Sequence, residues 1–219
     1  MLVAITALLL TLPTVQTKIA KYVVNNLNTK FDVNINVDQV AITIYGGVKL
    51  KKVLIKDYKN DTLIYSKTIY TNILDTKKLI DGDLLFGDLK LDNLVFNLVT
   101  HKGSNESNMD IFINKFGNKK QNLDGKHTLF NAKNVLIKNS KLSITDYNKE
   151  TPKNLDLKKW NATLKDLDIY GPKVNINIVK MSFLDHRGLL VENLSTKFSY
   201  TKKKMVLNQL ELYIGRAHV

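Results

Sequence analysis

The sequence predicts a mainly β protein, built as an elongated antiparallel sheet that follows two N-terminal helices. First, a string of one apolar residue, two polar residues and then apolar, any, apolar recurs, starting at Leu50, Leu91, Ala132, Leu164 and Leu207. Second, apolar and polar residues alternate over most of the chain after Phe31. Third, turn residues such as Gly46-Gly47, Asn60-Asp61 and Gly171-Pro172 separate the alternating stretches. A β unit that recurs along a chain indicates a repeated sheet rather than a closed catalytic domain.

The recurring string also predicts how the sheet bends. On a flat strand, residues three apart point to opposite faces. Yet both ends of each string are apolar around a polar pair. This pattern indicates a β-bulge or a tight strand change at the polar pair. A bulge in every unit would bend the sheet in one sense.

Period-two alternation predicts the individual strands. Val33, Ile35 and Val37 alternate with polar residues, as do two further sets, Val40, Ile42, Ile44 and Val174, Ile176, Ile178. Turn residues follow these stretches at Gly46-Gly47, Asp81-Gly82 and Gly171-Pro172. Strands that are joined by short turns favour an antiparallel meander.

The N-terminal part of the chain predicts two helical segments. Residues 1–12 are apolar except for Thr6 and Thr11. This stretch is too short to span a bilayer alone, which takes roughly 20 residues. The segment is either an atypical signal segment or a partial membrane anchor that begins before Met1, and we favour the partial anchor.

Residues 13–30 predict an amphipathic helix, which lies at a membrane interface or plugs the end of the sheet. Its apolar stripe is Val15, Ile19, Ala20, Val23, Val24 and Leu27.

The remaining chain divides into two β segments. Residues 31–117 form the first, which ends in a short helix marked by Met109, Phe112, Ile113 and Phe116. Residues 118–127 are a polar linker, and residues 128–213 form the second segment. Residues 214–219 match the product of a common sequencing adapter, so we expect a sequencing artefact there and a natural chain that continues past Tyr213.

Composition narrows the classes of partner. The formal net charge is +13, but the lysines occur as scattered doublets with no interleaved aromatic residues and no nucleic-acid motif. We therefore expect no nucleic-acid partner and a solvated outer sheet face. The absence of cysteine excludes disulfides and thiolate metal sites.

The sequence predicts no enzyme, no cofactor and no metal site. None of the four histidines lies at metal-ligand spacing from another histidine or a carboxylate pair. The stretch Asp185-His186-Arg187-Gly188 has turn composition between two strands and is interpreted as a hairpin turn. Trp160 precedes an alternating stretch and is interpreted as a packing or rim residue.

The order of these features resembles the AsmA-like family, specifically the N-terminal region of its TamB (translocation and assembly module) group. The resemblance covers nearly the whole chain and rests on the order of short strings rather than on any single one. In order, they are the helix at residues 15–23, the strand pair at 31–45, the stretches 48–57, 61–66 and 87–94, the short helix around Ile111, and the stretches 135–146, 155–169 and 181–200.

This resemblance implies a specific fold and function. The fold is a β-taco, a long U-shaped sheet with an apolar interior, anchored in the inner membrane by a single pass with its bulk in the periplasm. The implied function is carriage of phospholipid acyl chains between the inner and outer membranes during outer-membrane biogenesis. A TamA-type outer-membrane barrel would bind a C-terminal part that this chain lacks. The alternative is a non-catalytic structural or chaperone-like β protein that assists outer-membrane protein assembly or secretion.

We expect one set of apolar residues to line the lipid groove, although the same residues would also suit an ordinary sandwich core. The predicted lining residues are Val33, Ile35, Val37, Ile42, Ile44, Ile69, Ile73, Leu94, Phe96, Ile176 and Ile178.

Overall fold

The computed structural model describes residues 12–43, 47–73, 84–117, 130–151, 153–170, 173–201 and 203–215. Within these residues it confirms a mainly β chain, which also contains two helices. The helices are α2 (Pro13–Phe31) and α4 (Asn108–Gly117). The strands are β1 (Asn34–Asn36), β2 (Gln39–Ile42), β3 (Gly47–Lys56), β4 (Thr62–Ile73), β5 (Leu84–Thr100), β6 (Phe130–Asp146), β7 (Lys153–Tyr170), β8 (Lys173–Asp185), β9 (Leu190–Thr201) and β10 (Lys204–Ile214).

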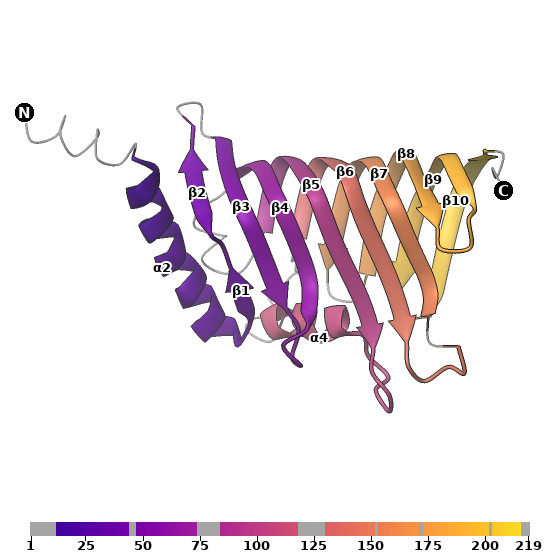
Figure 1. Ribbon diagram of the computed structural model, residues 1–219, viewed down its shortest axis with the longest axis horizontal. Helices are drawn as coiled ribbons and strands as arrows, with labels where there is room; N and C mark the ends of the chain where they lie inside the picture. The colour runs from indigo at the N-terminus through magenta and orange to yellow at the C-terminus, as the bar shows by residue number, and fades with distance from the viewer. Residues whose placement is uncertain are drawn as a thin grey trace, which may run out of the picture.

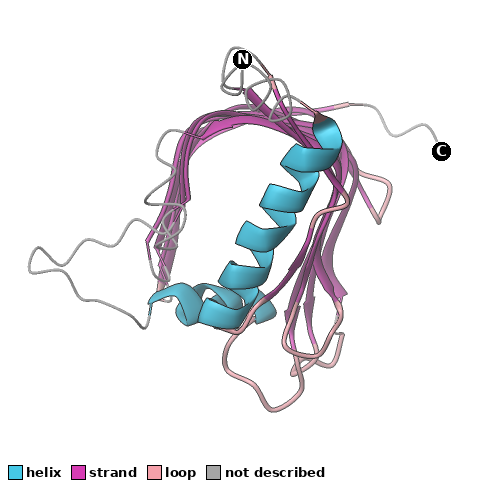
Figure 2. Ribbon diagram, turned by 90° about the vertical axis from the view of Figure 1, so that its left-hand side faces the viewer, coloured by secondary structure: helices cyan, strands magenta, loops and turns pink. Residues whose placement is uncertain are grey.

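The described strands form one ten-stranded sheet in nearly sequential order (Figure 1). The order is β1-β3-β4-β5-β6-β7-β8-β9-β10, with β2 also paired to β3. Viewed along its long axis, the sheet follows an arch (Figure 2). Both predicted β segments, residues 31–117 and 128–213, contribute strands to this one sheet.

The prediction of a purely antiparallel meander is wrong at one place. Strands β5 and β6 pair in parallel, with Leu84 opposite Phe130 and Thr100 opposite Asp146. A parallel pair requires the chain to return to the starting end of the sheet, which takes a connection of a dozen residues or more. Here the connection between Thr100 and Phe130 contains α4. The predicted linker at 118–127 lies outside the described residues.

Helix α2 covers the N-terminal edge of the sheet. The Gln16 side chain accepts a hydrogen bond from Ile42 N (2.8 Å) and donates one to Ile42 O (3.4 Å). Thr17 Oγ1 pairs with the backbone of Val40, and the Asn28 amide pairs with both backbone groups of Ile35. These side chains satisfy groups that would otherwise leave β1 and β2 as an open sheet edge.

The faces of α2 differ in part from the predicted stripe. Ala20 and Val24 pack against the cluster of Val37, Val40 and Val53, and Leu27 is buried. Ile19, which the prediction placed on the same stripe, is 49% exposed. One side of the helix therefore covers the sheet edge, and another side exposes apolar residues to solvent.

Helix α4 confirms the predicted short helix and lies beside the C-terminal end of α2. Phe116 stacks on Phe31 with ring centroids 4.7 Å apart. Lys115 forms an ion pair with Asp32, which caps α2 in a left-handed conformation (φ 52°). The two helices thus meet at one end of the arch.

The recurring string does mark the bends of the strands. The third residue of four of the five strings has a positive φ: Lys52, Asn93, Asp166 and Gln209. In the remaining string Asn134 has no such angle, yet Ala132 and Val135 still lie in one buried cluster. Each bend lets both apolar ends of a string face the same side of the sheet. Two further bends, which were not predicted from the sequence, occur at Asn139 and Lys159, each after a further polar residue.

Buried hydroxyl groups satisfy the backbone beside three of these bends. Ser140 Oγ accepts a hydrogen bond from Leu94 N (3.0 Å) and donates one to Lys138 O (2.8 Å). Ser66 Oγ lies 3.2 Å from Asp92 O, and Thr196 Oγ1 donates to Asn208 O (2.9 Å). Because these hydroxyls are buried, they take the place of water as hydrogen-bond partners of the backbone groups that lose their cross-strand partners at the bends.

Substitution of Asn93 tests the contribution of a bend. We expect Asn93→Val to lower the free energy of unfolding by about 1–3 kcal/mol, because a β-branched residue fits the left-handed region poorly. Asn93→Gly should change it by less than about 1 kcal/mol, because glycine adopts this conformation freely. Urea unfolding of both variants measures the difference, and equal stabilities would contradict the strained-bend interpretation.

Neither of the two described helices is long and apolar enough to cross a membrane. The predicted partial anchor, residues 1–12, lies outside the described residues except for Leu12.

Candidate functional site

One face of the sheet carries a continuous row of apolar residues across eight strands, which we call the central row. Each member is the direct cross-strand partner of the next. From β3 to β10 the central row is Leu50, Ile69, Leu91, Ile137, Ala162, Met181, Leu194 and Leu212.

A second row of paired apolar residues runs parallel to the first, nearer the end of the strands that carries α4. From β1 to β7 the second row is Ile35, Ile55, Ile64, Phe96, Leu142 and Leu157. Two rows of apolar pairs on the same face make a broad hydrophobic surface, because side chains on one face contact their cross-strand neighbours.

These rows lie on the concave side of the arch. Leu50 and Ile69 pack against the same cluster as Ala20 and Val24 of α2, and α2 lies across the end of the arch in Figure 2. The opposite face is polar: Lys49 and Lys90 lie over the ring of Tyr70, their shared cross-strand partner. The sheet therefore has a hydrophobic concave face and a charged convex face.

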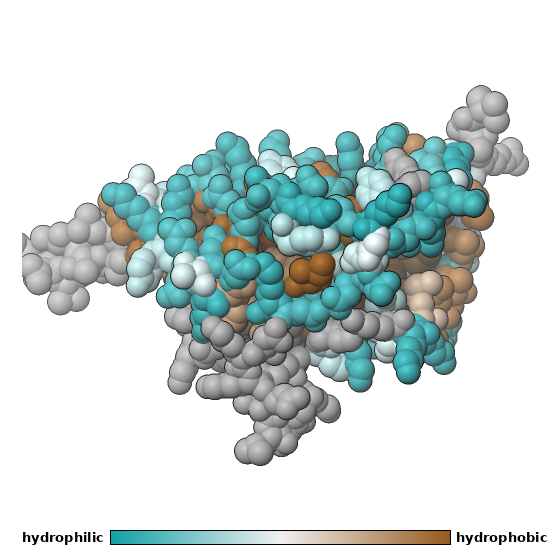
Figure 3. Space-filling view, turned by 90° about the horizontal axis from the view of Figure 1, so that it is seen from below, coloured by the Kyte–Doolittle hydropathy of each residue, from teal (hydrophilic) through white to brown (hydrophobic). Residues whose placement is uncertain are grey.

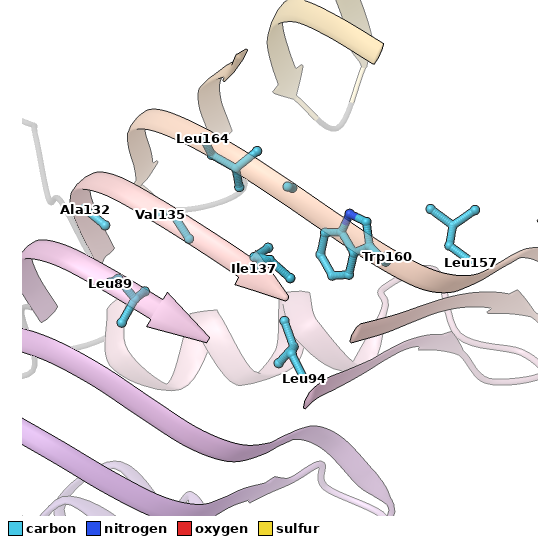
Figure 4. Close-up of a cluster of buried hydrophobic side chains, with 9 residues drawn as sticks. Leu89, Leu94, Ala132, Val135, Ile137, Leu157, Trp160 and Leu164 are labelled. Atoms are coloured by element: carbon cyan, nitrogen blue, oxygen red, sulfur yellow. The ribbon is translucent and has the colours of Figure 1, made fainter. Parts of the chain in front are cut away.

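The centre of the concave face is a cluster from β5, β6 and β7 (Figure 4). Its buried members are Leu89, Leu94, Ala132, Val135, Ile137, Leu157, Trp160, Ala162 and Leu164. Trp160 packs within this cluster, and its Nε1 atom is buried with no hydrogen-bond partner among the described residues. Of the two interpretations of Trp160, a packing residue or a rim residue, its position supports the first.

The open side of the arch exposes hydrophobic surface between hydrophilic rims (Figure 3). A cavity of about 550 Å3 lies against β3 to β7, and its lining combines apolar residues such as Val48, Leu89 and Val135 with polar and charged ones such as Lys49, Asp88 and Lys90. A second cavity of about 310 Å3 lies beside α4 and is lined by Val33, Asp57, Phe112 and others. The first cavity has room for a segment of an aliphatic chain but not for a whole lipid.

The structure brings five of the predicted lining residues together. Leu94 belongs to the buried cluster, and Ile69, Phe96, Ile176 and Ile178 pack around it. These five residues come from β4, β5 and β8 and share the concave face.

The other predicted lining residues lie elsewhere or are not described. Ile35 is in the second row, Val37 is buried in the cluster beside α2, and Val33 lines the cavity beside α4. Ile42 is 52% exposed on β2, where alternation alone placed it inside. Ile44 lies outside the described residues, as does the side chain of Ile73.

The far edge of the sheet is open and apolar. Strand β10 pairs only with β9 within the described sheet. Exposed hydrophobic residues gather along it: Met205, Leu207, Leu210, Leu212, Tyr213 and Ile214. The central row therefore reaches this edge without a covering element in the described structure.

The second row ends beside a buried carboxylate in the β8–β9 turn. Asp185 is opposite Leu157, and both of its oxygens accept hydrogen bonds from Arg187, from Nε at 3.0 Å and Nη2 at 2.9 Å. These bonds lower the pKa of Asp185 to about 2, against an opposing effect of burial. The residues form a tight turn with Gly188 at φ 90°, which confirms the predicted hairpin turn.

The pKa of Asp185 predicts an acid-dependent loss of stability. Because the folded-state pKa lies below the unfolded value of about 3.9, the contribution of the Asp185–Arg187 pair is present above pH 4 and is lost as the pH falls towards 2. We expect Arg187→Gln to lower the urea midpoint at pH 7 only modestly, because solvent screens the exposed Arg187 side chain. Urea unfolding at pH 7, 4 and 2.5 measures this, and a difference from the native chain that does not shrink with acid would contradict it.

A group of metal-ligating side chains lies at the rim, where the sequence predicted none. Carboxylate oxygens of Asp57 and Asp61 and a ring nitrogen of His101 all lie within 4.8 Å of one another. No local signal marks this group, because Asp61 and His101 are far apart in the sequence and only the sheet brings them together.

No protein-family model and no curated protein matches this chain.

Proposed function

We propose that this chain is part of a lipid-transfer bridge and that its concave face holds phospholipid acyl chains while head groups stay at the open side. The observation that carries this proposal is the central row, an apolar path that passes through eight neighbouring strands without a charged residue. A path of this kind suits a long, flexible hydrocarbon chain better than a compact ligand.

The physical driving force is burial of apolar surface. Each square ångström of hydrocarbon removed from water contributes about 25 cal/mol. Because the row consists of similar aliphatic side chains, neighbouring positions bind an acyl chain with similar free energy. Chains can then move along the row without a deep trap, and no catalytic residue is needed.

The positive charge of the convex face supports placement of the chain beside anionic lipid. The convex face carries lysines such as Lys49 and Lys90, and the chain has a net charge of +13. Positive side chains favour anionic lipid surfaces over neutral ones. Within this proposal the chain belongs to the AsmA-like family, in the TamB group, with an inner-membrane anchor and its bulk in the periplasm.

The outward side of α2 supports placement of the N-terminal end beside a membrane. Leu12, Ile19 and Tyr22 are exposed at helical spacing, with Tyr22 73% exposed, and Lys18 and Lys21 flank them. Helices with apolar and basic residues in this arrangement bind at the surface of a bilayer. The same helix covers the sheet edge with its other side, so its two predicted roles are compatible.

The direct test is to purify the chain in mild detergent and identify co-purifying lipid by mass spectrometry. We expect roughly stoichiometric phospholipid that is absent from an unrelated β protein prepared in the same way. Lipid-free protein that melts cooperatively as a compact unit would contradict the proposal and favour an ordinary sheet core.

A second candidate function is a chaperone-like role in outer-membrane protein assembly or secretion. The exposed apolar edge β10 favours it, because an unpaired strand edge can add an extended client segment by β-augmentation. A charged residue on the convex side of β10, for example Tyr213→Lys, would then weaken client binding while leaving lipid binding on the concave face intact.

A further inference from the structure

We infer that Asp57, Asp61 and His101 bind a divalent transition-metal ion of the Zn2+ class at the rim of the sheet. Asp57 directly follows β3, Asp61 directly precedes β4, and His101 directly follows β5. Their ligand atoms lie within 4.8 Å of one another, although they come from three strand ends. This inference does not depend on the proposed lipid function.

The Asp57 carboxylate is held in place as metal-ligating carboxylates usually are. Its side chain is fully buried. Oδ1 accepts hydrogen bonds from Lys59 N (2.9 Å) and Asp61 N (3.0 Å), and Oδ2 accepts one from Asn108 Nδ2 (3.1 Å). A carboxylate oxygen has two lone pairs, so Oδ2 retains one for a metal.

Asn108 is itself fixed and so orients this carboxylate. It is buried, its Oδ1 accepts a hydrogen bond from Val99 N (2.9 Å), and its Nδ2 also donates to Asn97 O (3.1 Å). An amide that orients a ligating carboxylate in this way is the outer-sphere support that metal sites commonly have.

His101 provides the independent indication of a ligand. Its Nε2 atom is buried and has no hydrogen-bond partner among the described residues, and only 15% of its side chain is exposed. The nearest acidic atom, Asp57 Oδ2, is 3.9 Å away, which is too far for a hydrogen bond. Tyr58 and Tyr147 pack on the ring with centroids 5.5 and 6.2 Å away and hold its orientation.

A metal between His101 Nε2 and Asp57 Oδ2 would remove the cost of leaving a buried nitrogen without a partner. Two ligands on one tetrahedral zinc, with bonds of about 2.1 Å, lie about 3.4 Å apart, so the 3.9 Å gap needs only a small closure. Asp61 is exposed, so a water molecule can complete the coordination.

The ligand set selects the class of metal. Imidazole nitrogen favours Zn2+ and similar transition ions, whereas Ca2+ and Mg2+ prefer oxygen ligands alone. We therefore expect Zn2+ to bind this site and Ca2+ or Mg2+ to bind it weakly.

The test is isothermal titration of the full chain, without a histidine tag, with Zn2+ and in parallel with Ca2+. Asp61→Asn and His101→Gln remove one ligand each, and Asp61 is exposed, so its variant should fold normally. The matched control is Asp38→Asn, an exposed aspartate that pairs with Lys52 instead. We expect one Zn2+ per chain, at least tenfold weaker binding in both ligand variants and unchanged binding in the control.

Nuclear magnetic resonance of the histidine side chains gives a second readout. Zn2+ should shift the His101 ring signals and leave those of His186, in the β8–β9 turn, unchanged. Absence of Zn2+ binding, or equal Zn2+ affinity in the native chain and both ligand variants, would overturn the inference. His101 and Asp57 would then form a structural contact that binds no metal.

Discussion

Ile176→Glu is expected to reduce phospholipid binding more than tenfold while the chain stays folded. Ile176 packs at the side of the concave cluster and is only partly buried. A carboxylate there remains hydrated in the free chain but must lose water when an acyl chain covers it, which costs several kcal/mol. A loss of about 1.4 kcal/mol already weakens binding roughly tenfold. Retention of a fluorescent phospholipid measures the loss.

The matched control is Asn177→Glu, one residue further along β8. Adjacent side chains on a strand point to opposite faces. This glutamate therefore lies on the convex side between Lys165 and Lys197, its cross-strand partners. We expect normal lipid binding in this variant. Global unfolding of Ile176→Glu by circular dichroism, or lipid binding equal to that of Asn177→Glu, would contradict an open lipid-binding face.

Trp160→Ala is expected to lower the free energy of unfolding by about 3–5 kcal/mol, because its removal leaves a cavity that the arch cannot close easily. The indole lies among buried residues of β5, β6 and β7. Urea denaturation followed by circular dichroism measures the change.

Trp160→Phe separates packing from hydrogen bonding at this position. Because Nε1 has no partner among the described residues, the phenyl ring loses volume but no hydrogen bond. We expect a loss below about 1.5 kcal/mol. A large loss in this variant, or a negligible one in Trp160→Ala, would show that the cluster does not stabilise the sheet as described.

The bends of the sheet could be predicted because their signal is local. Two adjacent polar residues between apolar ones, as at Leu91 to Leu94, indicate that two consecutive side chains both face outward. The bend at Asn139 does not match the string, because Ser140 stands where the string has an apolar residue. The bend at Lys159 was overlooked, although Leu157 to Ala162 matches the string.

Other features depend on contacts that no local pattern reports. Gln16 and Asn28 look like ordinary polar helix residues, and only the position of α2 beside β1 and β2 reveals that they pair with the sheet edge. The parallel β5–β6 pair depends on the route of a long connection. Ile42 alternates as an inward residue but is 52% exposed at the end of β2, although Gln16 of α2 pairs with its backbone.

The residues of the concave face could be predicted only in part, because a pattern within one strand does not report where the strand bends. Alternation identifies residues on the same face within one strand, such as Ile176 and Ile178, but each bend reverses which alternate set faces inward. Members of the central row such as Leu91 and Met181 were therefore absent from the predicted lining. The group at Asp57 and His101 was missed entirely, because these two residues follow different strands, β3 and β5, and are distant in the sequence.

Fluorescence of Trp160, the only tryptophan in the chain, tests the central claim most directly. Phospholipid brominated on its acyl chains quenches tryptophan only at short range. We expect strong quenching of Trp160, relative to unbrominated lipid, and little quenching of a tryptophan placed on the convex face by Tyr70→Trp with Trp160→Phe. Equal quenching at both positions, or none at Trp160 while lipid is bound, would contradict acyl-chain binding on the concave face.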